Sequence, residues 1–306
     1  MTENNIRTMI YGMIVGEIMG GINSRSNTYD AHIYPYKLVH PFQHDNLSLH
    51  LRCMFQLGNS VLQTKMYDKD CVLSQYFLTI NRKDCDTIKC SNMVNILKIY
   101  REANFLTNHA DVLTKLGARG LLKQNSEALL RCVTLIPCGD EIVREDCFIT
   151  NPFGDCVDCN IFFLKILKNC LLKQPIKLDE QMSTNLNIRK IIFLAKNKLP
   201  LDLKYDLNSW SNTLYCGLYV FSHINSFEEG MSWVIKNSSR EDMKENAAIV
   251  GCILGAKIGG KLYRESVTEK NFTEMTEILG RTGLGNYIDF YINVFEQSFM
   301  ETVHKK

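Results

Sequence analysis

Two cysteines one helical turn apart are the residues whose type and spacing most directly suggest chemistry. Cys156 and Cys159 form a Cys-x-x-Cys pair, which can supply half of a zinc site. A complete site needs a second close pair, and Cys85 and Cys90 are only a weak match to that pattern. Free cysteines are often buried as small apolar groups. The sequence therefore favours core cysteines on one helix, with zinc binding as the alternative.

The histidines and one glycine-rich segment show no comparable pattern. His40, His44 and His50 are close in sequence but form no ligand cluster, and His44 is expected to be a solvated loop residue. Gly280–Gly285 contains three glycines. No predicted strand precedes these glycines, so a nucleotide-binding loop is not expected there. A turn between two helices is the better interpretation.

Apolar residues repeat with the period of a helix along nearly the whole chain. Alternating strand patterns are scarce, and only six prolines interrupt the chain. We therefore predict an all-α fold, with residues 1–306 in a single domain. The long segment Gly20–Asn46 is expected to be irregular, and irregular segments of that length commonly carry function. The expected helices are Ile6–Met19, Leu47–Val61, Val72–Leu78, Met93–Tyr100, Cys156–Leu172, Thr213–Ile224, Phe227–Ile235, Ala247–Tyr263 and Ile288–Phe299.

Composition indicates a compact intracellular protein, most simply a cytoplasmic one. The net charge is only +2, so no bulk field favours nucleic acid or a membrane surface. Met1–Thr8 is polar and does not resemble a signal peptide. The apolar run Met9–Met19 contains Glu17 and is too short to span a bilayer. Twelve cysteines without a secretion signal indicate reduced thiols in a cytosol-like compartment.

A run of small and apolar residues follows Asp242, Lys244 and Glu245. This run, Asn246–Gly259, has glycines at four-residue intervals. Together these residues resemble the last motif of the ADP-ribosylglycohydrolases, Gly-Asp-x-Asp-Thr-Asn-Ala-x-Ile-x-Gly-x-x-x-Gly-Ala-x-x-Gly. That family removes ADP-ribose from modified proteins with a pair of divalent metal ions. The scaffold half of the motif is intact. In the chemical half, the resemblance places Asp242 on the first metal aspartate, Lys244 on the second, and Glu245 on the threonine.

The N-terminal segment Gly12–Gly20 resembles the family's opening motif, Gly-x-x-x-Gly-Asp-Ala-x-Gly. Glu17 stands where the family has aspartate. The glutamate that the family carries beside the scissile bond falls on Ser24. The resemblance therefore implies that this part of the site lacks the carboxylate at Ser24. At Glu17 it has a glutamate side chain, which is longer than the family's aspartate.

The family's second acidic motif, Thr-Asp-Asp-Thr, has its only counterpart at Gln43–Asn46. On that alignment Asp45 keeps one metal aspartate, His44 replaces the other, and both threonines are absent. The plain alternative is that Asp45 or Asn46 serves as an N-cap of the following helix, since both residue types are good caps.

Two middle segments also resemble family motifs. Asn125–Arg131 is similar to Ser-Asn-Gly-Ala-x-Met-Arg, and Thr150-Asn151-Pro152 is similar to Thr-His-Pro. Glu127 replaces the glycine that lets the backbone approach ADP-ribose, and its negative charge would be a poor neighbour for a diphosphate. The resemblance places these residues along the ligand cleft: Asn125, Ser126, Glu127 and Asn151.

The resemblance implies the family's helical fold but argues against its chemistry. Two of four motif aspartates and no motif threonine remain, and Asp45 and Asp242 alone would bind magnesium weakly. We therefore predict a degenerate member without hydrolase activity and without a cofactor, whose remnant cleft binds an ADP-ribose-like ligand or a protein partner. The alternative is a divergent active hydrolase that holds magnesium with Asp45 and Asp242 and recruits Glu17 or Glu245. A purely structural protein is a third class.

Two further predictions concern the closing motif. Gly251 and Gly255 lie on one helical face and should pack that helix closely against a neighbour. Lys244 either points to solvent or extends into the volume of the lost metal. In the second case its ammonium group would meet Asp45, Asp242 and Glu17, and would neutralise carboxylates that otherwise repel each other.

Overall fold

The structure, a computed structural model, describes residues 3–25, 48–64, 66–80, 91–201, 210–259 and 284–304. Within these ranges it contains helices and turns and no extended strand, which confirms the predicted all-α class. The first half contains α1 (Glu3–Arg25), α2 (Leu49–Thr64), α3 (Lys69–Thr79), α5 (Asn92–Glu102), α6 (His109–Ala118), α7 (Glu127–Arg131), η3 (Cys132–Leu135) and α8 (Asp140–Thr150). The second half contains α9 (Gly154–Leu171), η4 (Glu180–Met182), α10 (Leu186–Lys196), α11 (Trp210–His223), α12 (Phe227–Asn237), α13 (Met243–Ile258) and α15 (Leu284–His304).

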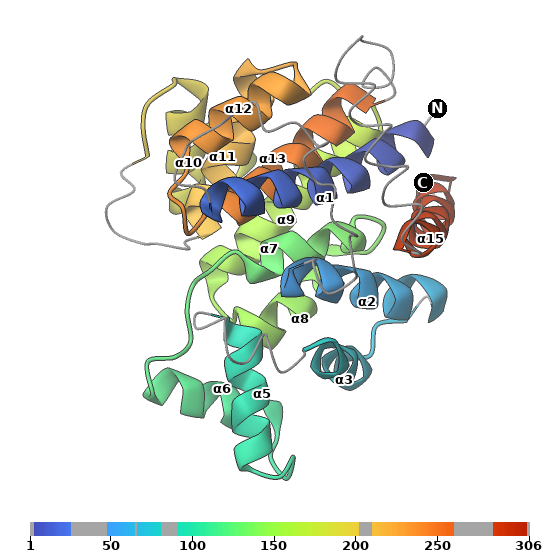
Figure 1. The fold of residues 1–306 in the computed structure, drawn as a ribbon, viewed down its shortest axis with the longest axis vertical. Helices are drawn as coiled ribbons and strands as arrows, with labels where there is room; N and C mark the ends of the chain where they lie inside the picture. Colours follow the sequence, from blue (N-terminus) through green and yellow to red (C-terminus); the bar gives the residue numbers. More distant parts are fainter. Residues whose placement is uncertain are drawn as a thin grey trace.

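The two helices with the glycine motifs, α1 and α13, lie side by side through the centre of the molecule (Figure 1). Helices α11 and α12 pack against α13, and α10 packs against α11 on the same side. Helices α3, α5 and α6 form the opposite end, and α15 packs against α2. The first and last family-like motifs are therefore neighbours in space although more than two hundred residues separate them.

The α1–α13 contact is made through glycine backbones. A Cβ atom on Gly251 would overlap the carbonyl oxygen of Gly12, and one on Gly255 would overlap the carbonyl oxygen of Thr8. The Thr8 hydroxyl also donates a hydrogen bond to the Gly255 carbonyl oxygen over 2.8 Å. Because no side chain separates the two backbones, the prediction that Gly251 and Gly255 pack a helix closely against a neighbour is confirmed.

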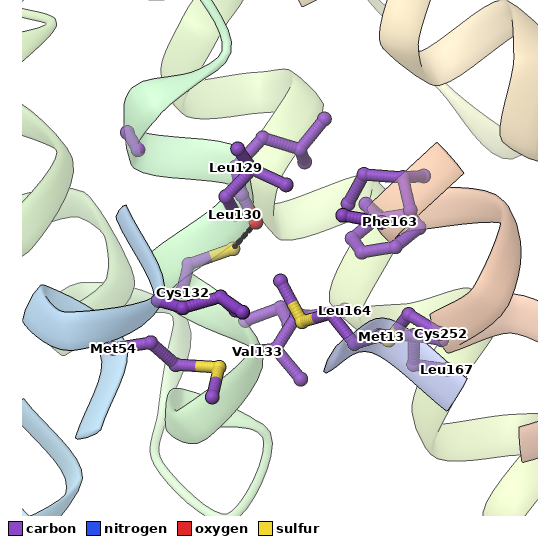
Figure 2. Close-up of a cluster of buried hydrophobic side chains, with 14 of the residues drawn as sticks. Met13, Met54, Leu129, Leu130, Cys132, Val133, Phe163, Leu164, Leu167 and Cys252 are labelled. Atoms are coloured by element: carbon purple, nitrogen blue, oxygen red, sulfur yellow. Dashed lines mark hydrogen bonds between the residues drawn. The ribbon is translucent and has the colours of Figure 1, made fainter. Parts of the chain in front are cut away.

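Beneath this pair, a continuous apolar core joins the central helices. Figure 2 shows Met13 of α1, Met54 of α2 and Cys252 of α13 converging on side chains from α7, η3 and α9. The side chains in this part of the core are fully or almost fully buried. The core therefore fixes the position of α1 and α13 relative to the middle motifs on α7 and α8.

The helix boundaries differ from the sequence prediction at both glycine motifs. The segment expected to be irregular from Gly20 is helical as far as Arg25, the end of α1. Gly20 lies against α13, where an added Cβ would be 2.6 Å from the Met243 carbonyl oxygen, so tertiary contact outweighs the low helix propensity of glycine. The helix expected to reach Tyr263 ends at Ile258, because Gly259 takes a positive φ of 58°. Residues 26–46 and 260–263 lie outside the described ranges.

Candidate functional site

Glu17 of α1 and Lys244 of α13 face each other where the two helices run together. The Lys244 Nζ atom lies 3.8 Å from Glu17 Oε1, with the carboxylate buried and the lysine partly exposed. The lysine stem passes over Gly21, whose missing side chain leaves room for it; an added Cβ would lie 3.8 Å from the lysine Cδ and Cε atoms. The contact is an ion pair, but it is too long for a hydrogen bond.

The second oxygen of Glu17 connects α1 to the start of α2. The Ser48 backbone N–H donates to Glu17 Oε2 over 3.4 Å. The Ser48 hydroxyl oxygen accepts from the Leu51 backbone N–H over 3.2 Å, the pattern of a helix N-cap. The suggestion that Asp45 or Asn46 caps this helix is therefore wrong. Both of those residues lie outside the described ranges.

Glu245 lies beside this ion pair in a largely buried position. Burial raises the pKa of Glu245 to about 7, the negative charges of Glu17 and Asp242 act in the same direction, and Lys244 opposes them. Glu245 Oε2 has no hydrogen-bond partner among the described residues. Four of the predicted site residues thus influence one another: Glu17, Asp242, Lys244 and Glu245.

His50 of α2 covers the same region. Its Nε2 atom is 3.8 Å from Glu245 Oε1. Burial, together with the charges of Lys244, Arg131 and Arg52, lowers the pKa of His50 to about 3. The imidazole is therefore neutral at physiological pH, so it contributes no positive charge to the acidic groups around it.

Asp242 precedes α13 and is held by groups from its own side of the molecule. Its Oδ2 atom accepts hydrogen bonds from Asn212 Nδ2 over 3.3 Å and from the Ser239 hydroxyl over 3.0 Å. A small cavity of about 100 Å³ borders it, with Tyr215 and Trp233 among its lining residues. Asp242 is buried and is engaged by neutral donors.

Ser24 makes a contact within its own helix, whereas Glu127 of the middle motif contacts the start of α5. The Ser24 hydroxyl donates to the Gly21 carbonyl oxygen over 3.0 Å within the last turn of α1. The Glu127 carboxylate is buried and accepts the backbone N–H groups of Asn92 over 2.8 Å and of Met93 over 3.2 Å. Since these are free N–H groups of the first turn of α5, Glu127 stabilises a helix end, where an acidic group is favoured. Its charge is directed to α5, which corrects the interpretation that the charge faces a ligand.

Asn125, Ser126 and Asn151 are buried beside Glu127. Asn151 Nδ2 donates to Asn125 Oδ1 over 2.8 Å, which links the two middle motifs. Asn125 Oδ1 also accepts from the Glu127 backbone N–H over 3.2 Å. The structure brings the middle-motif residues together as a hydrogen-bonded cluster.

Sequence reasoning missed a buried ionic network behind these residues. Arg131 Nε donates to Asp146 Oδ2 over 2.8 Å, and its NH1 group donates to the Thr150 hydroxyl over 2.7 Å. The Tyr76 hydroxyl donates to Asp146 Oδ1 over 2.7 Å. Both charged groups are 1% exposed. Arg131, at the end of the middle motif, was the available sequence signal for this network, because a buried arginine needs an acidic partner.

Comparison with solved structures identifies the fold of this chain. The chain is similar to a structure described as an "ADP-ribosylglycohydrolase-related protein complex", with a TM-score of 0.58 and 14% sequence identity, over 93% of this chain and 99% of that chain. This chain has the ADP-ribosylglycohydrolase fold. No protein-family model matches the sequence, and no curated protein matches it either.

Within this ADP-ribosylglycohydrolase fold, the described residues do not fit a pair of magnesium ions. No group of three or more histidine, cysteine, aspartate or glutamate side chains in the described ranges is arranged to hold a metal ion. The Glu17 carboxylate faces the ammonium group of Lys244, which repels a cation at close range. Asp45, the other predicted metal ligand, lies outside the described residues.

The cysteine pair is part of the core of the ADP-ribosylglycohydrolase fold. Cys156 and Cys159 are both buried in α9. Burial raises the pKa of the Cys156 thiol to about 12, so it stays protonated and is a poor metal ligand. The core interpretation is confirmed, while Cys85 and Cys90 lie outside the described ranges.

In the part of the chain that the structure describes, no helix has the length and hydropathy to cross a bilayer.

Proposed function

We propose that this protein is a degenerate ADP-ribosylglycohydrolase-like protein that does not hydrolyse ADP-ribose linkages, and that its remnant cleft binds an ADP-ribose-like ligand or a protein partner. The observation that carries the proposal is the contact between Lys244 Nζ and Glu17 Oε1 at 3.8 Å. By resemblance, those two positions belong to the acidic motifs that hold metal in the family. Here an ammonium group takes the place of one of the carboxylates.

The charge balance supports this proposal. Two dications need several anionic oxygens close by, and each acidic group without a cation raises the pKa of its neighbours. Lys244 supplies one positive charge to Glu17 and Glu245, while Glu245 is about half protonated at neutral pH because its pKa is about 7. Glu17, Lys244 and Glu245 together therefore carry little net charge without any metal ion, and Asp242 beside them is held by neutral hydrogen-bond donors.

An activity assay tests the proposal directly. We expect no detectable removal of ADP-ribose from proteins modified on arginine or serine when this protein is assayed with magnesium beside an active relative. A cooperative melt of the same preparation controls for folding. Calorimetry with ADP-ribose tests the binding part. Magnesium-dependent turnover that disappears in Asp45→Ala would instead establish the active alternative.

A substitution at Lys244 separates the built-in cation from a solvent-exposed lysine. Lys244→Asp should lower the free energy of unfolding without metal by about 1–2 kcal/mol, between the values of exposed and buried ion pairs, because it places a carboxylate beside Glu17. Added magnesium should then raise the melting temperature of this variant. The measurement is thermal melting with and without magnesium.

The matched control is Lys244→Met, which removes the ammonium group without adding a metal ligand. It should lose stability but show no response to magnesium. If Lys244→Asp melts like the parent protein and ignores magnesium, Lys244 is not a substitute for a cation.

One observation favours a second candidate function, a divergent hydrolase. A carboxyl group with a pKa of about 7 suits a general acid at neutral pH, and Glu245 has one oxygen without a hydrogen-bond partner among the described residues. In that case the turnover found in the assay above should be abolished by Glu245→Gln, which keeps the size of the side chain and removes its acidity.

A further inference from the structure

A surface groove lies between α3, α5 and the loop before α6. Figure 1 shows these helices at one end of the molecule, away from the α1–α13 pair. The volume of the groove is about 630 Å³, within the range of ligand-binding clefts. The apolar residues Leu73, Phe77 and Leu78 line it from α3. Tyr100 of α5 and Phe105 of the loop before α6 line it from the other side. It is therefore a predominantly apolar groove between two helices and a loop.

The aromatic wall of the groove is fixed in place by its own contacts. The rings of Phe77 and Tyr100 meet edge to face at 5.2 Å, and those of Tyr100 and Phe105 stack at 6.1 Å. The Tyr100 hydroxyl lies 3.3 Å from His109 Nδ1, and His109 Nε2 lies 2.9 Å from the Ile149 carbonyl oxygen. Because that carbonyl only accepts, Nε2 carries the proton and Nδ1 accepts from the tyrosine. The wall is thus anchored to α8 and preformed.

The rim exposes large apolar side chains that folding normally buries. Leu78 is 81% exposed and Phe105 is 56% exposed. Phe105 has a φ of 59° and follows Asn104 at 48°. A bulky side chain is uncommon in this left-handed region, and such outliers gather at binding sites. The turn holds the Phe105 ring against Tyr100 and leaves much of the side chain exposed to solvent.

The carboxylate of Asp70 places a negative charge on one side of the groove. Asp70 lines it from the first turn of α3 and is exposed. It has no ion pair among the residues that the structure describes. Asn108, another lining residue, donates to Asp111 over 2.8 Å, which adds a second carboxylate nearby. Lys69 is a neighbouring cation. Burial lowers the pKa of His109, and the positive charge of Lys69 lowers it as well.

We propose that this groove binds a short segment of a partner protein in which a large apolar side chain stands next to a lysine or arginine. The apolar side chain lies against Phe77 and Tyr100. The cation pairs with Asp70 and covers the exposed face of Phe105, since cations are attracted to aromatic faces. Leu78, on the exposed rim of the groove, contacts the segment where it leaves the groove, which favours an extended peptide over an enclosed small molecule.

A peptide-display selection against the folded protein tests this proposal. Enriched random dodecapeptides should carry an aromatic or leucine residue within two positions of a basic residue. Phe105→Asn and Asp70→Lys should each weaken the affinity of the best peptide at least tenfold in calorimetry. Asparagine tolerates a positive φ, so Phe105→Asn removes the ring without straining the turn. If Phe105→Asn fails to fold, the peptide affinity of Asp70→Lys tests the proposal instead, because Asp70 is exposed and its replacement should not disturb folding.

The matched control is Leu186→Ser on α10, because Leu186 is 75% exposed and lies outside the groove; it should leave affinity unchanged, whereas Leu78→Ser should reduce it. The proposal is overturned if no peptide is enriched, or if the enriched peptides bind the groove variants as well as the parent. It is also overturned if the groove closes on a second copy, seen as self-association that Leu78→Ser abolishes.

Discussion

Replacing Arg131 with methionine is expected to lower the free energy of unfolding by about 3–5 kcal/mol, the cost of breaking a buried ion pair. Methionine fills much of the arginine volume but donates no hydrogen bond. Asp146 would keep the Tyr76 hydroxyl as a donor and lose Arg131 Nε at 2.8 Å. The carboxylate would remain 1% exposed and without a cation. Urea denaturation measures the loss.

An exposed ion pair of the same type provides the control. Arg119 contacts Glu102 at 2.9 Å, with side chains that are 49% and 55% exposed. Arg119→Met should cost at most about 1 kcal/mol, because solvent screens such pairs. Equal losses in the two variants would show that Arg131 is not held in a low-dielectric interior.

The sequence predicted the fold well because its clearest signals are also the main packing contacts. The glycines of Gly12–Gly20 and Asn246–Gly259 mark the faces on which α1 and α13 touch through their backbones. Long apolar repeats predicted α2, α9 and α11 with small boundary errors, whereas α15 extends well beyond the predicted Ile288–Phe299 at both ends. Helix α8 was missed for a physical reason: Asp146 lies on its buried face and interrupts the apolar repeat. Its pairing with Arg131 and its hydrogen bond from Tyr76 make that burial acceptable.

The candidate site was less predictable, because its contacts depend on distances between helices. The motifs identified Glu17, Asp242, Lys244 and Glu245 as candidate site residues. Spacing along the chain could not show that Lys244 crosses to Glu17 over Gly21.

Glu127 gives a second example of this limit. Its role depends on the N-terminus of α5, which begins 35 residues earlier in the sequence. A resemblance to a motif can therefore locate a side chain without giving its partner.

Gly255→Ala is expected to lower the free energy of unfolding by about 3 kcal/mol, the upper end of the cost of overpacking. The added methyl group would overlap the carbonyl oxygen of Thr8, a backbone atom of α1 that cannot rotate away. The Thr8 hydroxyl bond to the Gly255 carbonyl oxygen, 2.8 Å long, would be strained as the helices separate. Thermal and urea unfolding measure the effect, and Gly255→Leu should prevent folding.

Gly117→Ala is the matched control, because Gly117 also lies within a helix, α6, but an added Cβ there meets no atom within 4 Å. Alanine is the better helix former by about 0.5–1 kcal/mol, so this variant should be more stable than the parent. The same substitution is thus expected to have opposite signs at the two sites. If both variants raise stability, helix propensity rather than the α1–α13 contact sets the result, and close packing of these two backbones does not limit the stability of the fold.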